Sequence, residues 1–213
     1  MKNDTNLQLE PNSKPYLLKR IISDGFDTVS IFVLFMVISA LIFASPLANV
    51  YNEHYENYKR VKDEAVAEYG DDAEAITNKL SNDRYYLDEQ FAANLHSYLL
   101  KLLAGFIAEA AVLAAVPLIS KQRGTPGQLM TGIIPFKEKK QTKADAKTIL
   151  LRFVYVFIID SAVFYLFTGI FTFLLIPVIR LVEILINKKN KTLCDALTGV
   201  IMIEKLSYDG IDK

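Results

Sequence analysis

The stretch TVSIFVLFMVISALIFASPLANVYN, residues 28–52, is 25 residues long and contains no charged side chain. A run of about 20 apolar residues matches the thickness of the hydrocarbon core of a bilayer. The apolar helices that fill the core of a soluble protein are usually shorter than this. We therefore predict that the stretch belongs to a membrane-spanning helix at about residues 20–50.

Two more apolar blocks follow in the chain. Residues 90–120 contain two charged residues, and residues 148–187 contain four. The third apolar block, at 148–187, would be about 60 Å long as one helix at 1.5 Å per residue, which is about twice the thickness of the bilayer core. It is better interpreted as two helices, at about 149–168 and 171–187. The sequence thus predicts an all-α membrane protein with four transmembrane helices.

The overall composition agrees with a membrane protein. The 213 residues are 52% hydrophobic and 23% charged, and the mean hydropathy is +0.23. These values exclude intrinsic disorder and a coiled-coil chain. The single cysteine excludes a disulfide scaffold. The 24 basic residues balance the 24 acidic ones, so any information in the charges must lie in where they stand.

The charges are segregated along the chain. Residues 51–92 have eleven acidic and five basic side chains, whereas residues 121–148 have seven basic and two acidic ones. Short loops rich in Lys and Arg stay in the cytoplasm. We therefore expect a multi-pass protein of the plasma membrane with both termini in the cytoplasm. The predicted divisions are a flexible cytoplasmic N-terminus at 1–15, a membrane domain at 16–204 with an extracytoplasmic acidic helical insertion at 51–89, and a cytoplasmic tail at 205–213.

The acidic insertion has its own helical pattern. Its tyrosines recur at spacings of three and four residues, which predicts an amphipathic helix. Gly70-Asp71-Asp72 should end this helix, and 74–80 should form a second, short one. The tyrosines could anchor an extracytoplasmic protein partner, or they could pack within a helical hairpin or at the lipid interface. The residues that set the pattern are Tyr51, Tyr55, Tyr58, Val61, Ala65 and Tyr69.

Several ionisable residues fall at membrane depth. Such residues are costly in a bilayer and usually face the interior of a helix bundle or water. Counting the rise per residue places four of them in one layer of the inner half of the membrane, with more negative than positive charge. A bound cation or protonation would relieve this excess. The alternative is an ion-pair and hydrogen-bond network that fixes helix packing. The layer contains Asp27, Glu109, Asp160 and Arg180, and Arg20 and Asp24 lie on the same stripe of the first helix as Asp27.

Two similar motifs follow the second and fourth helices. The first runs from Gly124 to Ile133 and the second from Lys191 to Val200. They close with Thr-Gly-Ile-Ile-Pro-Phe and Thr-Gly-Val-Ile-Met-Ile. Each could lead into a short extended segment, and the two segments could pair as a small ribbon under the membrane.

With these motifs the chain resembles the RDD family of bacterial membrane proteins, which is named for one Arg and two Asp. Gln128 stands where the family usually has Lys, and Cys194 where it usually has His. The resemblance covers residues 16–204 apart from the acidic insertion. It implies a multi-helix membrane domain, with transport as a suggested role. The matching residues are Arg20, Asp27, Thr125, Pro126, Gly127, Arg152 and Asp195.

One consequence concerns the inner interface, where Arg20, Arg152 and Asp195 should lie. Asp195 could pair with Arg20 or with Arg152 and fasten the second motif under the helices. Breaking a buried pair of this kind costs about 3–5 kcal/mol.

The leading functional hypothesis is binding or transport of a monovalent cation, a proton or a small solute, with Asp27 as the central carboxylate. The alternative is an accessory protein whose insertion binds a partner. We expect no enzyme, because the sequence offers no Ser-His or Cys-His pair. We also expect no cofactor and no metal, since His54 and His96 are far apart in the sequence and lack ligand spacing. The expected partners include the lipid bilayer and exclude nucleic acid, and a homo-oligomer is left open.

Overall fold

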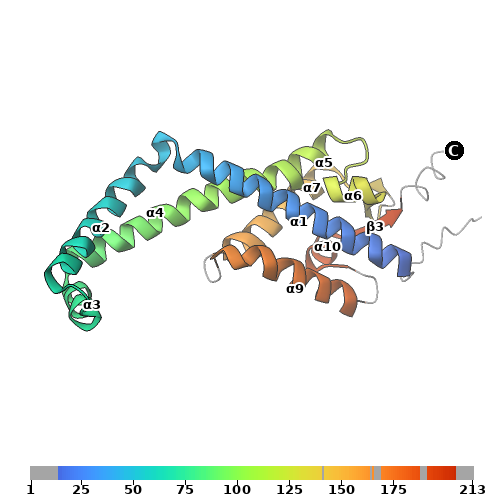
Figure 1. Ribbon diagram of the computed structural model, residues 1–213. Helices are drawn as coiled ribbons and strands as arrows, with labels where there is room; N and C mark the ends of the chain where they lie inside the picture. Colours follow the sequence, from blue (N-terminus) through green and yellow to red (C-terminus); the bar gives the residue numbers. More distant parts are fainter. Residues whose placement is uncertain (1–13, 141, 164, 166–168, 188–190, 205–213) are drawn as a thin grey trace, which may run out of the picture. The chain divides into compact units, whose positions relative to one another are not determined.

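The computed structural model describes residues 14–140, 142–163, 165, 169–187 and 191–204. The chain divides into two compact units, and Figure 1 labels their helices and strands. The motif unit consists of Met1–Phe35 with Gly105–Lys213, and the hairpin unit consists of Met36–Ala104. The predicted termini at 1–15 and 205–213 lie almost entirely outside the described residues.

The first helix, α1, spans Lys14–Phe43 and ends earlier than expected. The reason is Pro46, which cannot donate a backbone hydrogen bond and disfavours the helical conformation at the residue before it. Ser45 is extended and caps the short 3-10 helix η1 (Pro46–Ala48), where its side chain accepts from the N–H of Leu47.

The second apolar block forms one continuous helical segment. It comprises α4 (Arg84–Glu109), the π-helical η2 (Ala110–Ala115) and α5 (Val116–Ile119). By length and composition, Leu17–Phe43 and Arg84–Ile119 could each cross a membrane. The chain is therefore mainly helical with two candidate membrane spans.

The third block is divided as expected. It contains α7 (Ala146–Tyr155), the π-helical η3 (Val156–Val163), the 3-10 helix η4 (Gly169–Phe171) and α9 (Thr172–Ile186). Gly169 has a φ of +57°, a left-handed conformation that favours glycine at a helix break. The 15 residues of α9 extend about 22 Å, less than the bilayer core. The third and fourth crossings are thus not confirmed.

The hairpin unit contains the two helices predicted for the insertion. They are α2 (Asn49–Tyr69) and α3 (Ala73–Asn82). Gly70 ends α2 with a positive φ of 59°, and the side chain of Asp72 caps α3 by accepting from the N–H of Ala75. The break at Gly70-Asp71-Asp72 is confirmed.

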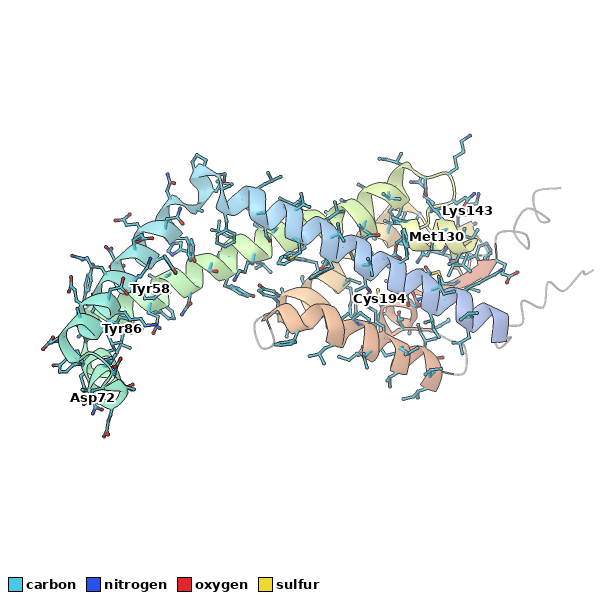
Figure 2. All side chains as sticks on the ribbon, viewed as in Figure 1. Tyr58, Asp72, Tyr86, Met130, Lys143 and Cys194 are labelled. Atoms are coloured by element: carbon cyan, nitrogen blue, oxygen red, sulfur yellow. The ribbon has the colours of Figure 1, made fainter. Side chains whose placement is uncertain are left out.

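The tyrosines of α2 contact one another and α4. Ring centroids are 5.7 Å apart between Tyr51 and Tyr55 and 5.2 Å apart between Tyr55 and Tyr58. Tyr58 is 6.0 Å from Tyr86 of α4, and Figure 2 shows these two side chains together, with Asp72 near the far end of the hairpin. Burial raises the pKa of the Tyr58 hydroxyl, and the neighbouring tyrosines raise it further. The structure thus matches the interpretation in which the tyrosines pack within a helical hairpin.

The two histidines of the hairpin unit lie closer in the structure than their spacing in the sequence suggests. The two histidines are distant in the sequence, yet their rings stack with centroids 5.3 Å apart. The antiparallel course of α2 and α4 brings positions 54 and 96 together, which sequence spacing does not reveal.

The motif unit contains a small sheet, which an all-α prediction leaves out. Strand β1 (Ile133–Lys137) pairs antiparallel with both β2 (Thr142–Lys143) and β3 (Val200–Glu204), in the order β2-β1-β3. Pro135 lies opposite Met202. The predicted pairing of the two similar sequence endings is therefore confirmed.

Candidate functional site

Each similar motif forms a short helix followed by a strand. Helix α6 (Pro126–Thr131) leads into β1, and α10 (Leu193–Thr198) leads into β3. Both begin with a Thr in a capping box and end at a left-handed Gly. In a capping box the first side chain accepts a backbone N–H, and a side chain three residues later accepts in return. The two motifs thus share one local design.

In α10 the capping box is formed by Thr192 and by Asp195, which stands three residues later. Its Oδ2 accepts from the N–H of Thr192 at 3.1 Å, and the Thr192 hydroxyl accepts from the N–H of Asp195 at 3.2 Å. The carboxylate also lies in the first turn of the helix, where negative charge is stabilised by the helix dipole.

Asp195 also pairs with two arginines from different helices. Arg20 Nη2 of α1 donates to Oδ2 and Arg152 Nη1 of α7 donates to Oδ1, each at 2.5 Å. Asp195 is only 1% exposed and Arg20 only 2%. The sequence predicted one of these pairs, and the structure contains both. Asp195 therefore fastens α10 to α1 and α7 at once.

The pKa of Asp195 reflects these contacts. Burial is the largest single influence and raises it, but the charges of Arg20 and Arg152 and the hydrogen bonds of Arg152 and Thr192 together lower it by more. The result is a pKa of about 2. The side chain is thus a carboxylate at neutral pH.

In α6 the corresponding contact comes from α1. Both oxygens of Asp27 accept hydrogen bonds: Oδ2 from the hydroxyl of Thr125 at 2.5 Å and Oδ1 from the N–H of Gly127 at 2.7 Å. Asp27 is buried. Its carboxylate therefore completes the N-terminus of α6, which supports the interpretation as a packing network. Whether Asp27 also binds a cation is not tested by this arrangement.

The position of Gly127 requires glycine. A Cβ added there would lie 2.2 Å from the carbonyl oxygen of Ser23 in α1 and 3.0 Å from Oδ1 of Asp27. Real Cβ atoms essentially never approach other heavy atoms so closely. The absence of a side chain thus lets α6 contact the backbone of α1.

A cavity of about 270 Å³ lies among these elements in the motif unit. Its wall combines apolar residues, such as Val156 and Ile176, with six residues of the charged types. These are Arg20, Asp24, Asp27, Arg152, Arg180 and Glu183. The structure therefore brings the charged stripe of α1 together with Arg152 of α7 and two charged residues of α9.

Asp24 stands out on the cavity wall. Its Oδ2 lies 3.6 Å from Nε of Arg20. Within the part of the chain that the structure describes, this oxygen is buried and accepts no hydrogen bond. It thus retains acceptor capacity beside the cavity.

Two of the four residues of the predicted charge layer lie at the cavity. Asp27 and Arg180 line the cavity, whereas Glu109 is buried at the start of η2 and is not part of the cavity wall. The side chain of Asp160, in η3, lies outside the described residues. Among the residues that the structure describes, no group of three His, Cys, Asp or Glu side chains is arranged to hold a metal ion.

A comparison with known protein families matches residues 14–199 to the RDD family. The chain belongs to the RDD family. No curated protein and no solved structure matches it. Family membership and the two long apolar helices together indicate a membrane protein.

Gln128 and Cys194, the two residues expected to depart from the family pattern, both lie at the cavity. Oε1 of Gln128 accepts from the N–H of Thr125 at 3.1 Å, which a Lys in its place would be unable to do because an ammonium group only donates. Cys194 is buried and lines the cavity. Figure 2 shows Cys194 on α10.

Sequence reasoning missed Glu183 as part of the site. Its Oε2 accepts from the N–H of Leu193 at 3.0 Å, which joins α9 to the first turn of α10. The only available signal was an acidic residue in an apolar helix, and it gave no indication of the partner.

Proposed function

We propose that the cavity of the motif unit binds a monovalent cation or a proton, and that this RDD protein moves that ion across the membrane. The observation that carries the proposal is the cavity itself, which places six Asp, Glu and Arg side chains in an apolar helical region. Such groups in membrane segments usually mark ion pathways or proton relays. A water molecule occupies about 30 Å³ of liquid, so the volume suits a partly hydrated ion.

The charge at the cavity supports a cation over an anion. Three arginines and three carboxylates line the wall, and Asp195 adds a fourth carboxylate behind Arg20 and Arg152. One negative charge is left over when all seven groups are ionised. Asp24 is better placed to contact the ion than Asp27 and Asp195, because those two already accept hydrogen bonds with both oxygens.

Asp24→Asn should abolish ion movement while leaving the fold intact. The amide retains the shape of the carboxylate but removes the excess negative charge. We expect wild-type protein in proteoliposomes to move Na⁺, K⁺, Li⁺ or H⁺ down an imposed gradient, and the variant to be at the level of empty vesicles. Asp88→Asn, at an exposed position of the hairpin unit, is the control and should behave as wild type. No flux with any of the four ions, or equal flux in Asp24→Asn, would contradict the proposal.

We further propose four crossings, with both termini and the motifs in the cytoplasm and 51–89 outside. The segregation of basic and acidic segments supports this orientation. A reporter that is active only in the cytoplasm should be active when fused after residue 213 and inactive when inserted near Gly70. Activity at only the inserted position would show that the orientation is the opposite one. Activity at both positions would show that the insertion lies in the cytoplasm.

The other functional expectations remain predictions. A protein partner for 51–89, a homo-oligomer and the absence of enzymatic activity are not tested by the structure. The tyrosines expected to anchor a partner contact one another, so no observation now favours the accessory role over ion binding.

A further inference from the structure

A groove of about 490 Å³ runs along α9 and α10 in the motif unit. Most of its wall is apolar and includes Val182 and Ile186 of α9. Asn187 and Lys191, which lie between the two helices in the chain, also belong to the wall. Ile186 is 78% exposed, so this α9–α10 groove is open at the protein surface.

The α9–α10 groove and the cavity share part of their walls. Three residues line both of them: Ile179 and Glu183 of α9, and Leu193 of α10. Two of these three are bonded to each other, because Oε2 of Glu183 accepts from the N–H of Leu193 at 3.0 Å. The boundary between the groove and the cavity therefore includes a carboxylate that is held against α10 by one hydrogen bond.

Glu183 still has an oxygen that can contact a cation. Within the part of the chain that the structure describes, its second oxygen, Oε1, accepts no hydrogen bond. Asp27 contacts the first turn of α6 in a similar way, but it uses both of its oxygens. A carboxylate oxygen beside an apolar wall attracts a cation more strongly than one in bulk water, because the surroundings screen the charge less.

The basic residue of the groove does not oppose a cation. Nζ of Lys191 donates to Oε2 of Glu138 at 2.7 Å. The Lys191 side chain is 10% exposed, whereas that of Glu138 is 41% exposed. The member of this pair that faces solvent is therefore the acidic one.

We propose that the α9–α10 groove is the route by which the cation enters and leaves the cavity, and that Glu183 passes the ion between the two. The inference rests on the cation site proposed for the cavity, to which it adds the access route. The ion meets Oε1 of Glu183 in the groove, and rotation of the side chain then brings it to Asp24. This rotation releases the N–H of Leu193, which the carboxylate binds again once the ion has passed. Because the motifs are proposed to lie in the cytoplasm, the route opens on that side.

Cys194 provides a native reporter of the route. It is the only cysteine of the chain, and it is buried on the cavity wall. In inside-out vesicles, a methanethiosulfonate reagent with a trimethylammonium group should modify it, and one with a sulfonate group should do so much more slowly. Val182→Trp should slow modification by the cationic reagent about tenfold or more, because the larger side chain fills the groove and raises the barrier to entry. Leu185→Trp is the matched control: Leu185 is an exposed residue of α9 that lines neither the groove nor the cavity, and this variant should react as wild type.

Glu183→Gln separates the charge of the side chain from its hydrogen bond. The amide oxygen can still accept from the N–H of Leu193, so the unfolding midpoint should not change. Without the negative charge, flux of the ion that the wild type moves should fall about tenfold or more, and Cys194 should lose its preference for the cationic reagent. Saturable binding of the ion should remain, because Asp24 is intact. Glu204→Gln is the control, since Glu204 is an acidic residue of the motif unit that lines neither the groove nor the cavity.

The two proposals fail in different ways. Modification of Cys194 at the wild-type rate in Val182→Trp, or unchanged flux in Glu183→Gln, would overturn the access route and leave the cation site of the cavity in place. A wild type that moves none of Na⁺, K⁺, Li⁺ and H⁺ would overturn the proposed function. In that case, loss of the cationic preference at Cys194 in Glu183→Gln would still support the route.

Discussion

Asp195→Asn should destabilise the protein by about 3–5 kcal/mol, because removing one partner of a buried ion pair leaves the other charge uncompensated. Here two guanidinium groups lose their common carboxylate, and Arg20 is almost fully buried. The expected result is a large drop in the midpoint of thermal unfolding in detergent, measured by the loss of monodisperse protein on heating. Loss of expression in the membrane would be the extreme form of the same effect.

The control for this substitution is Asp145→Asn. Asp145 also caps a helix and also pairs with a basic residue, Lys137, at 2.8 Å, but it is 52% exposed. Its loss should cost about 1 kcal/mol, the usual value for a helix cap. Combining Asp195→Asn with Arg152→Gln removes one of the two arginine charges that have lost their carboxylate, and should restore part of the free energy of unfolding. Equal unfolding midpoints for wild type and Asp195→Asn would refute the role of Asp195 as a clamp.

The same carboxylate predicts a pH dependence. Its pKa is lowered to about 2 in the folded protein, because the two arginines and the hydrogen bond from Thr192 together outweigh the effect of burial, whereas an unfolded Asp titrates near 3.9. A lowered pKa contributes stability that is complete above about pH 4 and is lost as the pH falls toward about 2. Asp195→Asn should remove this component, so the difference in unfolding midpoint between variant and wild type should shrink over that interval.

Gly127→Ala should separate α6 from α1. The new methyl group would lie 2.2 Å from the carbonyl oxygen of Ser23, and the helix must move away to relieve the clash. Overpacking of this kind costs about 1–3 kcal/mol, and loss of the hydrogen bond from Gly127 N–H to the Asp27 carboxylate adds about 1.5–3 kcal/mol. We expect a drop in the unfolding midpoint comparable to that of Asp195→Asn.

Gly25→Ala is the matched control for this change. Gly25 lies in α1 between Ser23 and Asp27, and an added Cβ would have no heavy atom within 4 Å. Alanine is favoured over glycine in a helix by about 1 kcal/mol, so this variant should be as stable as wild type or slightly more stable. If Gly127→Ala has the same unfolding midpoint as Gly25→Ala, then α6 and α1 do not make the close contact described here.

The sequence predicted the helical elements well because length and apolar periodicity are local properties. The hairpin of α2 and α3, the division of the third apolar block and the pairing of β1 with β3 follow from such patterns. The end of α1 was placed too late, because the apolar run continues beyond Pro46 although the helix does not.

The contacts of the site were harder to predict. The sequence suggested that either Arg20 or Arg152 pairs with Asp195. The carboxylate has two oxygens, and each of them accepts from one of the two arginines. Gly127 has no side chain to indicate a partner, so its contact with Asp27, 100 positions away, has no signal in a single sequence.

The predicted layer of charges shows a different limit. Depth was calculated for straight α-helices, but Glu109 directly precedes a π-helical segment and Asp160 lies within another. A π-helical turn has a longer hydrogen-bond repeat than an α-helical one, so residue counting loses the rotational position of the side chain. Arg20 of α1 and Arg152 of α7 lie in α-helical segments, and both contact Asp195 as the sequence suggested.

Equilibrium binding of radiolabelled Na⁺ to the purified protein, with unlabelled K⁺, Li⁺ and H⁺ as competitors, tests the central claim most directly. If the cavity holds a cation site, the wild type and Asp88→Asn should both bind labelled Na⁺ saturably. If another ion is preferred, that ion should displace the labelled Na⁺ from both proteins. It also predicts loss of that binding in Asp24→Asn, with its unfolding midpoint unchanged. Saturable binding of equal affinity in Asp24→Asn, or no binding and no flux of any of the four ions in the wild type, would contradict it.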